Sequence, residues 1–154
     1  MIYLICWLVQ DLLCVLTWGI MQIPEIFLLS LVYRLMTQDR EMSISIIWWA
    51  FFGGLFWDLR WVGIPGLYTL IYVCTVMLTL WVWNTLPASG RTPVVIFFLF
   101  WTTQVLSPLL TLLLPGRNIR EMEWTFFAVQ QGCVVPLALL GLFFYLKHVK
   151  DHNA

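Results

Sequence analysis

The chain has 154 residues, of which 62% are hydrophobic and only 10% charged, and its mean hydropathy is +0.89. Soluble domains contain only about 45–50% apolar residues, so this composition indicates an integral membrane protein. The eight basic and eight acidic residues leave a formal net charge of zero. A basic surface of the kind that binds nucleic acid is therefore not expected.

Long continuous apolar runs predict helices, because a membrane barrel needs alternating polar and apolar residues. At about 20 residues for each crossing, the chain has room for six helices and for no soluble domain. We therefore predict an all-α protein with one domain over residues 1–154, a compact bundle of six transmembrane helices. Proline, glycine and charged residues separate the six candidate spans, which are Ile2–Ile20, Pro24–Met36, Ser43–Trp57, Pro65–Trp83, Pro93–Leu114 and Trp124–Leu146.

The first span is expected to be a retained helix, since no Lys or Arg precedes its apolar run and no small-residue cleavage site follows it. Five basic residues fall on the side of the two termini and three on the opposite side, which favours a cytoplasmic position for both termini. On the side of the termini these are Arg34, Arg40, Arg91, Lys147 and Lys150, and on the opposite side Arg60, Arg117 and Arg120.

The sequence contains no familiar catalytic or metal-binding motif, so we expect no catalytic residue, cofactor or metal. The four cysteines lie in apolar runs without C-x-x-C spacing and are expected to pack as small hydrophobic residues. They are Cys6, Cys14, Cys74 and Cys133. His148 and His152 stand four residues apart in the tail, but two ligands at an exposed terminus make a weak metal site.

Two charged residues fall inside the first two spans, where each one needs a partner, water or neutralisation. If these spans form a hairpin that turns near Gln22 and Ile23, Asp11 and Arg34 lie at the same depth. We predict an intramembrane ion pair between them. The alternative is that Arg34 extends to the cytoplasmic interface and Asp11 is protonated.

Other polar groups are expected to hold helices together. Pro24 and Glu25 open the second span, where a carboxylate would cap the positive end of the helix dipole. Spans five and six carry amides and a hydroxyl that would bond across helices or line a small cavity. These residues are Gln104, Ser107, Gln130 and Gln131.

The stretch FFGGLFWDLRWVGIPGLYTLIYV places charges between two apolar runs. We assign Asp58 and Arg60 to a short turn at the outer membrane interface. Asp58 would hold this turn by accepting backbone N–H bonds at the start of span four, or by pairing with Arg60. Gly53 and Gly54 are expected to allow close packing between spans three and four.

With the segment IPEIFLLSLVYRLM, this stretch resembles the rod shape-determining protein MreD family. The resemblance rests on a proline and an acid that open span two, a glycine-rich third helix that ends in aspartate, and Gly-Leu-Tyr at the fourth. In this sequence the corresponding residues are Pro24, Glu25, Gly54, Leu55, Asp58, Gly66, Leu67 and Tyr68, with Leu70 and Tyr72 continuing the apolar face.

The resemblance implies a non-enzymatic scaffold in the bacterial cytoplasmic membrane that supports rod shape and lateral peptidoglycan synthesis. The implied partners are MreC and, through it, MreB and RodA with its transpeptidase. The family fold is similar to the substrate-binding subunits of energy-coupling-factor transporters, so a vitamin-binding subunit is the main alternative. Span one lacks the alanines with which those subunits dock. A proton-coupled or ion-conducting protein that uses Asp11 and Asp58 is a third possibility.

Overall fold

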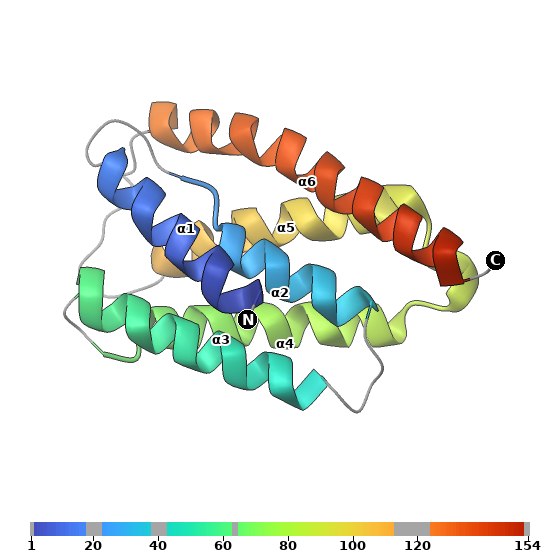
Figure 1. The fold of residues 1–154 in the computed structure, drawn as a ribbon, viewed down its shortest axis with the longest axis horizontal. Helices are drawn as coiled ribbons and strands as arrows, with labels where there is room; N and C mark the ends of the chain where they lie inside the picture. The colour runs from blue at the N-terminus through green and yellow to red at the C-terminus, as the bar shows by residue number, and fades with distance from the viewer. Residues whose placement is uncertain (1, 18–22, 38–42, 63–64, 113–123, 153–154) are drawn as a thin grey trace.

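The computed structural model describes residues 2–17, 23–37, 43–62, 65–112 and 124–152. Within these ranges the chain is helical apart from short connections, and no strand occurs. The elements in chain order are α1 (Ile2–Leu16), α2 (Ile26–Thr37), α3 (Ser43–Trp57), the π-helical η2 (Asp58–Val62), α4 (Leu67–Thr85), the 3-10 turn η3 (Ala88–Gly90), α5 (Pro93–Leu112) and α6 (Trp124–His152) (Figure 1).

The predicted spans match these helices closely. The bounds of α3 agree with the prediction at both ends, and α5 and α6 begin where predicted, at Pro93 and Trp124. Helices α2 and α4 each begin two residues after the proline predicted to open them. Helix α6 continues six residues beyond the predicted end at Leu146, to His152. The predicted end of span one, Ile20, lies outside the described residues.

Among the described residues, three helices are long and apolar enough to cross a membrane. Their apolar stretches are Leu67–Thr85, Pro93–Leu110 and Phe127–Lys150. Helices α1 and α2 are apolar but shorter, and α2 has only 12 residues. At 1.5 Å per residue, α2 spans about 18 Å, whereas a hydrocarbon core is about 30 Å thick. The described chain therefore has the architecture of a helical membrane protein, with short helices packed among long ones.

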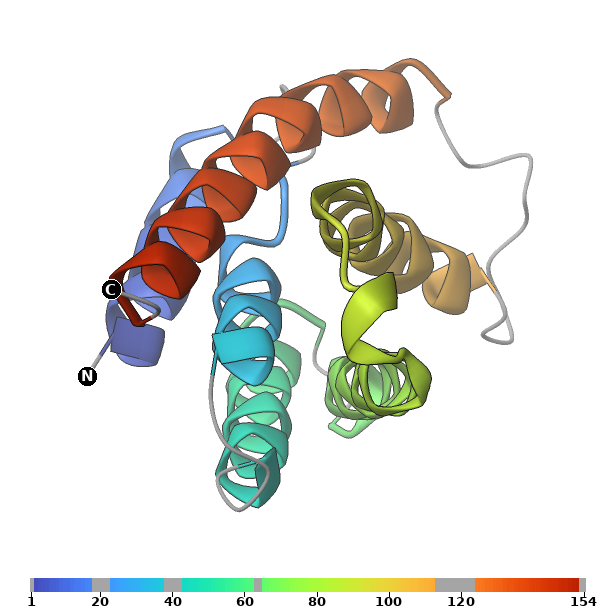
Figure 2. The ribbon, with the colours of Figure 1, turned by 90° about the vertical axis from the view of Figure 1, so that its right-hand side faces the viewer.

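The shortest helix, α2, forms the centre of the bundle. It contacts each of the other helices (Figure 2), and the buried hydrophobic core includes six of its side chains. These are Phe27, Leu28, Leu31, Val32, Leu35 and Met36. The other side chains of α2 are half-buried, and none is exposed. The other helices thus shield α2, and their own outer faces carry the exposed apolar side chains.

The end of α3 differs from the predicted short turn. The helix continues directly into η2, so Asp58 and Arg60 lie in a helical extension. η2 is wound as a π-helix, a rare form that often occurs at functional sites. Its helical geometry sets the directions in which the Asp58 and Arg60 side chains point. Residues two apart on a helix point away from each other. Asp58 accordingly reaches α4, whereas Arg60 reaches α1.

Candidate functional site

The Asp58 carboxylate fixes the start of α4. Its Oδ1 accepts the Tyr68 backbone N–H at 2.7 Å, and its Oδ2 accepts those of Gly66 and Thr69 at 3.0 Å each. The Thr69 hydroxyl also donates to Oδ2, at 2.9 Å, and Asp58 is fully buried. The first N–H groups of a helix have no partner within it. Asp58 therefore acts as the cap of α4 from the preceding helix, and it does not pair with Arg60.

Glycines allow the close packing around this cap. A Cβ atom added to Gly54 would lie 2.5 Å from the Thr69 Cα, so the backbones of α3 and α4 meet there. Gly66, just before α4, has a φ of 104°, a backbone angle that residues with a side chain rarely adopt. The residues Gly54, Asp58, Gly66 and Tyr68 thus belong to one structural unit, which we call the α3–α4 joint.

Gly53 refines the prediction, because the atoms nearest to its open side belong to Phe27 of α2. A Cβ atom added at this position would collide with the Phe27 ring. Consecutive helix residues point about 100° apart, since a turn contains 3.6 residues. Gly53 and Gly54 therefore serve two different helix contacts.

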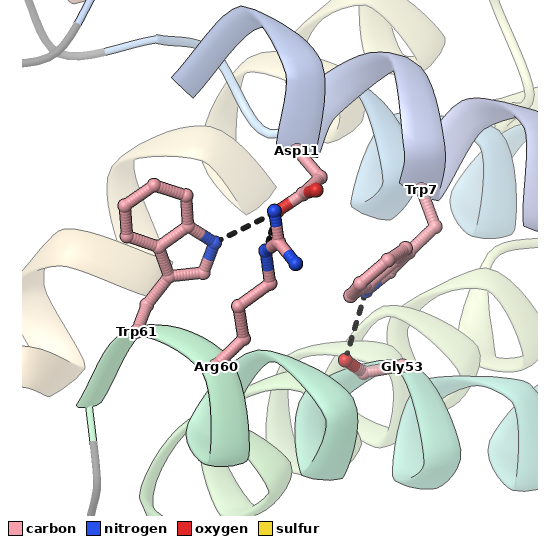
Figure 3. Close-up of polar contacts among 5 residues, drawn as sticks. All are labelled: Trp7, Asp11, Gly53, Arg60 and Trp61. Atoms are coloured by element: carbon pink, nitrogen blue, oxygen red, sulfur yellow. Dashed lines mark hydrogen bonds and ion pairs between the residues drawn. The ribbon is translucent and has the colours of Figure 1, made fainter. Parts of the chain in front are cut away.

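Asp11 lies in a second polar contact, between α1 and η2. Its Oδ1 is 2.6 Å from the Arg60 Nε and accepts the Trp61 indole N–H at 2.9 Å (Figure 3). Asp11 is buried, while the Arg60 side chain is 52% exposed. One turn earlier on α1, the Trp7 indole N–H donates to the Gly53 carbonyl at 3.2 Å. These contacts connect α1 to the end of α3.

The predicted ion pair between Asp11 and Arg34 is not formed in the described structure. The Asp11 carboxylate binds Arg60 instead, and the neighbouring Gln10 side chain contacts the Phe27 backbone. Arg34 is about two helical turns further along α2 than Phe27. The prediction assumed two helices joined by a tight turn. Residues 23–25 are not helical, however, and non-helical chain advances about twice as far per residue as a helix.

The start of α2 lies inside the bundle and is held by side chains from other helices. From α1, the Gln10 Oε1 accepts the Phe27 N–H at 2.8 Å, and the Gln10 Nε2 lies 3.4 Å from the Tyr72 hydroxyl of α4. From α6, the Gln130 Nε2 donates to the Ile23 carbonyl at 3.2 Å. Both glutamines are buried.

Helix α5 holds Glu25 on both its backbone and its side chain. The Gln104 Oε1 accepts the Glu25 N–H at 2.8 Å, while the Gln104 Nε2 donates to the Glu25 carbonyl at 3.1 Å. The Ser107 hydroxyl donates to the Glu25 Oε1 at 2.7 Å. We refer to Gln10, Glu25, Gln104, Ser107 and Gln130 as the α2-start cluster.

The role predicted for Pro24 and Glu25 needs correction. The Glu25 carbonyl accepts the Leu29 N–H and so begins the helix, but its carboxylate contacts Ser107 on α5. The Phe27 N–H, near the start of α2, is capped by the Gln10 side chain instead. Pro24 is buried and lies two residues before α2. Gln104 and Gln130 were predicted to be interhelical residues, whereas Gln10 was not, and which backbone groups all three bind follows only from the fold.

The remaining polar candidates form no further centre in the described ranges. Four free, half-buried cysteines are present there, and no group of three or more His, Cys, Asp or Glu residues in these ranges could hold a metal ion. His148 lies on α6, and the side chain of His152 is outside the described residues. The polar groups that the structure brings together thus act mainly on backbone and on neighbouring helices.

Comparisons with protein-family models, with curated proteins and with solved structures give no match for this chain.

Proposed function

We propose that this chain is a non-enzymatic membrane scaffold of the bacterial cell-elongation machinery, of the MreD type. In this proposal all six helices lie in the bacterial cytoplasmic membrane with both termini in the cytoplasm. The protein supports rod shape and lateral peptidoglycan synthesis through MreC. RodA with its transpeptidase and, indirectly, MreB are the further partners.

The α3–α4 joint is the observation that carries the proposal. Four of the residues on which the resemblance rests, although separated in sequence, contribute to one connection. Gly54 allows the helices to touch, Gly66 takes the left-handed conformation, and Asp58 binds the N–H groups of Gly66 and Tyr68. A motif that joins two helices rigidly suits a protein that presents fixed surfaces. Each acceptor oxygen of Asp58 is already bound to the chain itself, which supports a structural role for this carboxylate.

The centre of the bundle supports the same role. The start of α2 is held from α1, α5 and α6, so the central helix is fixed to its neighbours. Large apolar side chains are exposed on α1, α3 and α6, among them Leu12, Trp48 and Phe143. Helices associate in lipid through side-chain packing and small residues. A rigid bundle with apolar outer faces is suited to binding a single-pass partner within the bilayer.

Depletion of the protein in its own rod-shaped host tests the proposal. Microscopy is expected to show wider, rounded cells, and a tagged copy is expected to co-purify with MreC. Normal cell width after depletion would refute the function. A vitamin-like molecule that co-purifies in stoichiometric amount, identified by mass spectrometry, would support the transporter subunit instead.

A further inference from the structure

An apolar groove lies between α1 and α3. The two helices run in the same direction side by side, and side chains bridge the space between them at three levels. The bridges are the Tyr3 and Trp49 rings, 5.2 Å apart, the hydrogen bond from Trp7 to Gly53, and the ion pair between Asp11 and Arg60.

The groove has a volume of about 250 Å³ and is lined almost entirely by apolar side chains, including Leu4 and Leu8 of α1, Phe52 and Phe56 of α3, and Phe27 of α2. Pockets for drug-sized molecules usually measure about 300–1,000 Å³, and a helix with its side chains is about 10–12 Å wide. A space this small and apolar fits a flexible hydrocarbon chain better than it fits a drug-sized molecule or a helix.

Charged and aromatic groups lie beyond one end of the groove. Arg60 is one turn after Phe56, and its side chain is 52% exposed. Its guanidinium carbon lies 5.8 Å from the centre of the Trp61 ring. Its closest contact with Asp11 uses Nε, and a guanidinium has five N–H donors. Because the side chain as a whole is half-exposed, the guanidinium can hold a second anionic oxygen.

We propose that this groove and Arg60 together bind one glycerophospholipid, with an acyl chain between α1 and α3 and the phosphate on the Arg60 guanidinium. Arginine binds phosphate oxygens through paired, charge-assisted hydrogen bonds. Trp61, next to Arg60, is half-buried and has the amphipathic ring typical of the headgroup level. Because Asp11 neutralises the charge of Arg60, the phosphate is recognised by hydrogen-bond donors more than by net charge. This proposal does not depend on the scaffold function.

Native mass spectrometry of the delipidated, detergent-purified chain mixed with dioleoyl phosphatidylglycerol or dioleoyl phosphatidylcholine tests the proposal. We expect one retained phospholipid per chain, with similar retention of the two lipids. Arg60→Gln is expected to weaken retention about tenfold, because it removes charge-assisted hydrogen bonds. Leu8→Trp is expected to do the same by filling the groove. Arg60→Lys, which keeps the charge beside Asp11 but not the paired geometry, should fall between wild type and Arg60→Gln.

Matched controls separate this site from general lipid contact. Leu12→Trp makes the same change at an exposed residue of α1 that does not line the groove, and Lys150→Gln removes an exposed cation from α6. Both are expected to retain the phospholipid like the wild type, and all variants are first checked for helical circular dichroism and a single elution peak. Equal retention by Leu8→Trp and Leu12→Trp, or full retention by Arg60→Gln, would overturn the proposal.

A photoreactive benzoylphenylalanine in place of Phe56, whose aromatic ring already lines the groove, identifies the occupant in native membranes. Irradiation is expected to add the mass of a phospholipid. Crosslinking to another polypeptide, or to a second copy of this chain, would assign the groove to a protein partner and refute the lipid site. Neither experiment uses cell shape, so failure of the lipid proposal is distinguishable from failure of the scaffold proposal.

Discussion

Replacing Asp58 with asparagine tests whether its carboxylate holds the α3–α4 joint. The carboxylate accepts backbone N–H groups from Gly66, Tyr68 and Thr69 and the Thr69 hydroxyl. Asparagine has nearly the same shape but only one acceptor oxygen. With that oxygen in the Oδ2 position it keeps the bonds from Gly66 and Thr69, but its NH₂ group then faces the Tyr68 N–H, and neither donor has an acceptor.

The magnitude follows from these bonds. Loss of one charge-assisted hydrogen bond, with two buried donors left facing each other, is expected to lower the free energy of unfolding by about 2–3 kcal/mol. Asp58→Ala removes every acceptor and is expected to cost about 4–5 kcal/mol. For a chain of this size, each kcal/mol lowers Tm by roughly 2–4 °C.

Unfolding of the purified protein in detergent, followed by circular dichroism during heating or during titration with dodecyl sulfate, measures this effect. Asp11→Asn is the matched control, because it makes the same chemical change in a carboxylate that binds Trp61 and the half-exposed Arg60. It is expected to cost about 1 kcal/mol or less. A smaller loss for Asp58→Asn than for Asp11→Asn would refute the assignment of Asp58 as the cap of α4.

Three further changes test neighbouring contacts by the same unfolding measurement. Gly54→Ala places a Cβ 2.5 Å from the backbone of α4 and should destabilise the protein by about 1–3 kcal/mol. The control Gly132→Ala on α6 meets open space and should be neutral or stabilising by up to about 1 kcal/mol. A larger loss of stability for Gly132→Ala than for Gly54→Ala would contradict the close helix contact. Gln104→Leu removes the acceptor of the Glu25 N–H and one of the two donors to its carbonyl, which keeps the bond from Leu29. It should cost about 1–3 kcal/mol; no loss would show that the bonds from Gln104 are dispensable. Exchange of charges, Asp11→Arg with Arg60→Asp, should recover part of the stability that either single change removes; a strictly additive double variant would contradict this pairing.

Hydrophobic runs and prolines were sufficient to predict most helix bounds. Apolar length is visible in the sequence, so α3 was predicted at both ends and the starts of α5 and α6 were correct. The predicted span ended at Leu146 because the apolar run ends there. The polar residues that follow contain no helix breaker, so α6 continues to His152. Within the part of the chain that the structure describes, three helices are long enough to cross a membrane. The shorter α2 is buried among its neighbours, a property of packing that no local pattern reveals.

Polar partners were predictable only where they are close in sequence. Asp58 and the N–H groups that it binds are separated by at most 11 residues, so the turn between them suggested the contact. The partner of Asp11 depends on two features that hydropathy does not contain. One is the π-helical winding that continues α3 through Arg60, and the other is the non-helical segment that shifts α2 along α1.

The α3–α4 joint and the α2-start cluster both provide hydrogen-bond partners for the start of a helix. Lipid provides no acceptor for the N–H groups at the start of a helix, so a start inside the bundle requires acceptors from elsewhere in the chain. At α4 the preceding helix supplies a single carboxylate, Asp58. The start of α2 lies level with the middle of α1, and there glutamines from α1, α5 and α6 supply both acceptors and donors. An amide satisfies both kinds of backbone group with one neutral side chain. The buried glutamines are therefore a consequence of the short central helix.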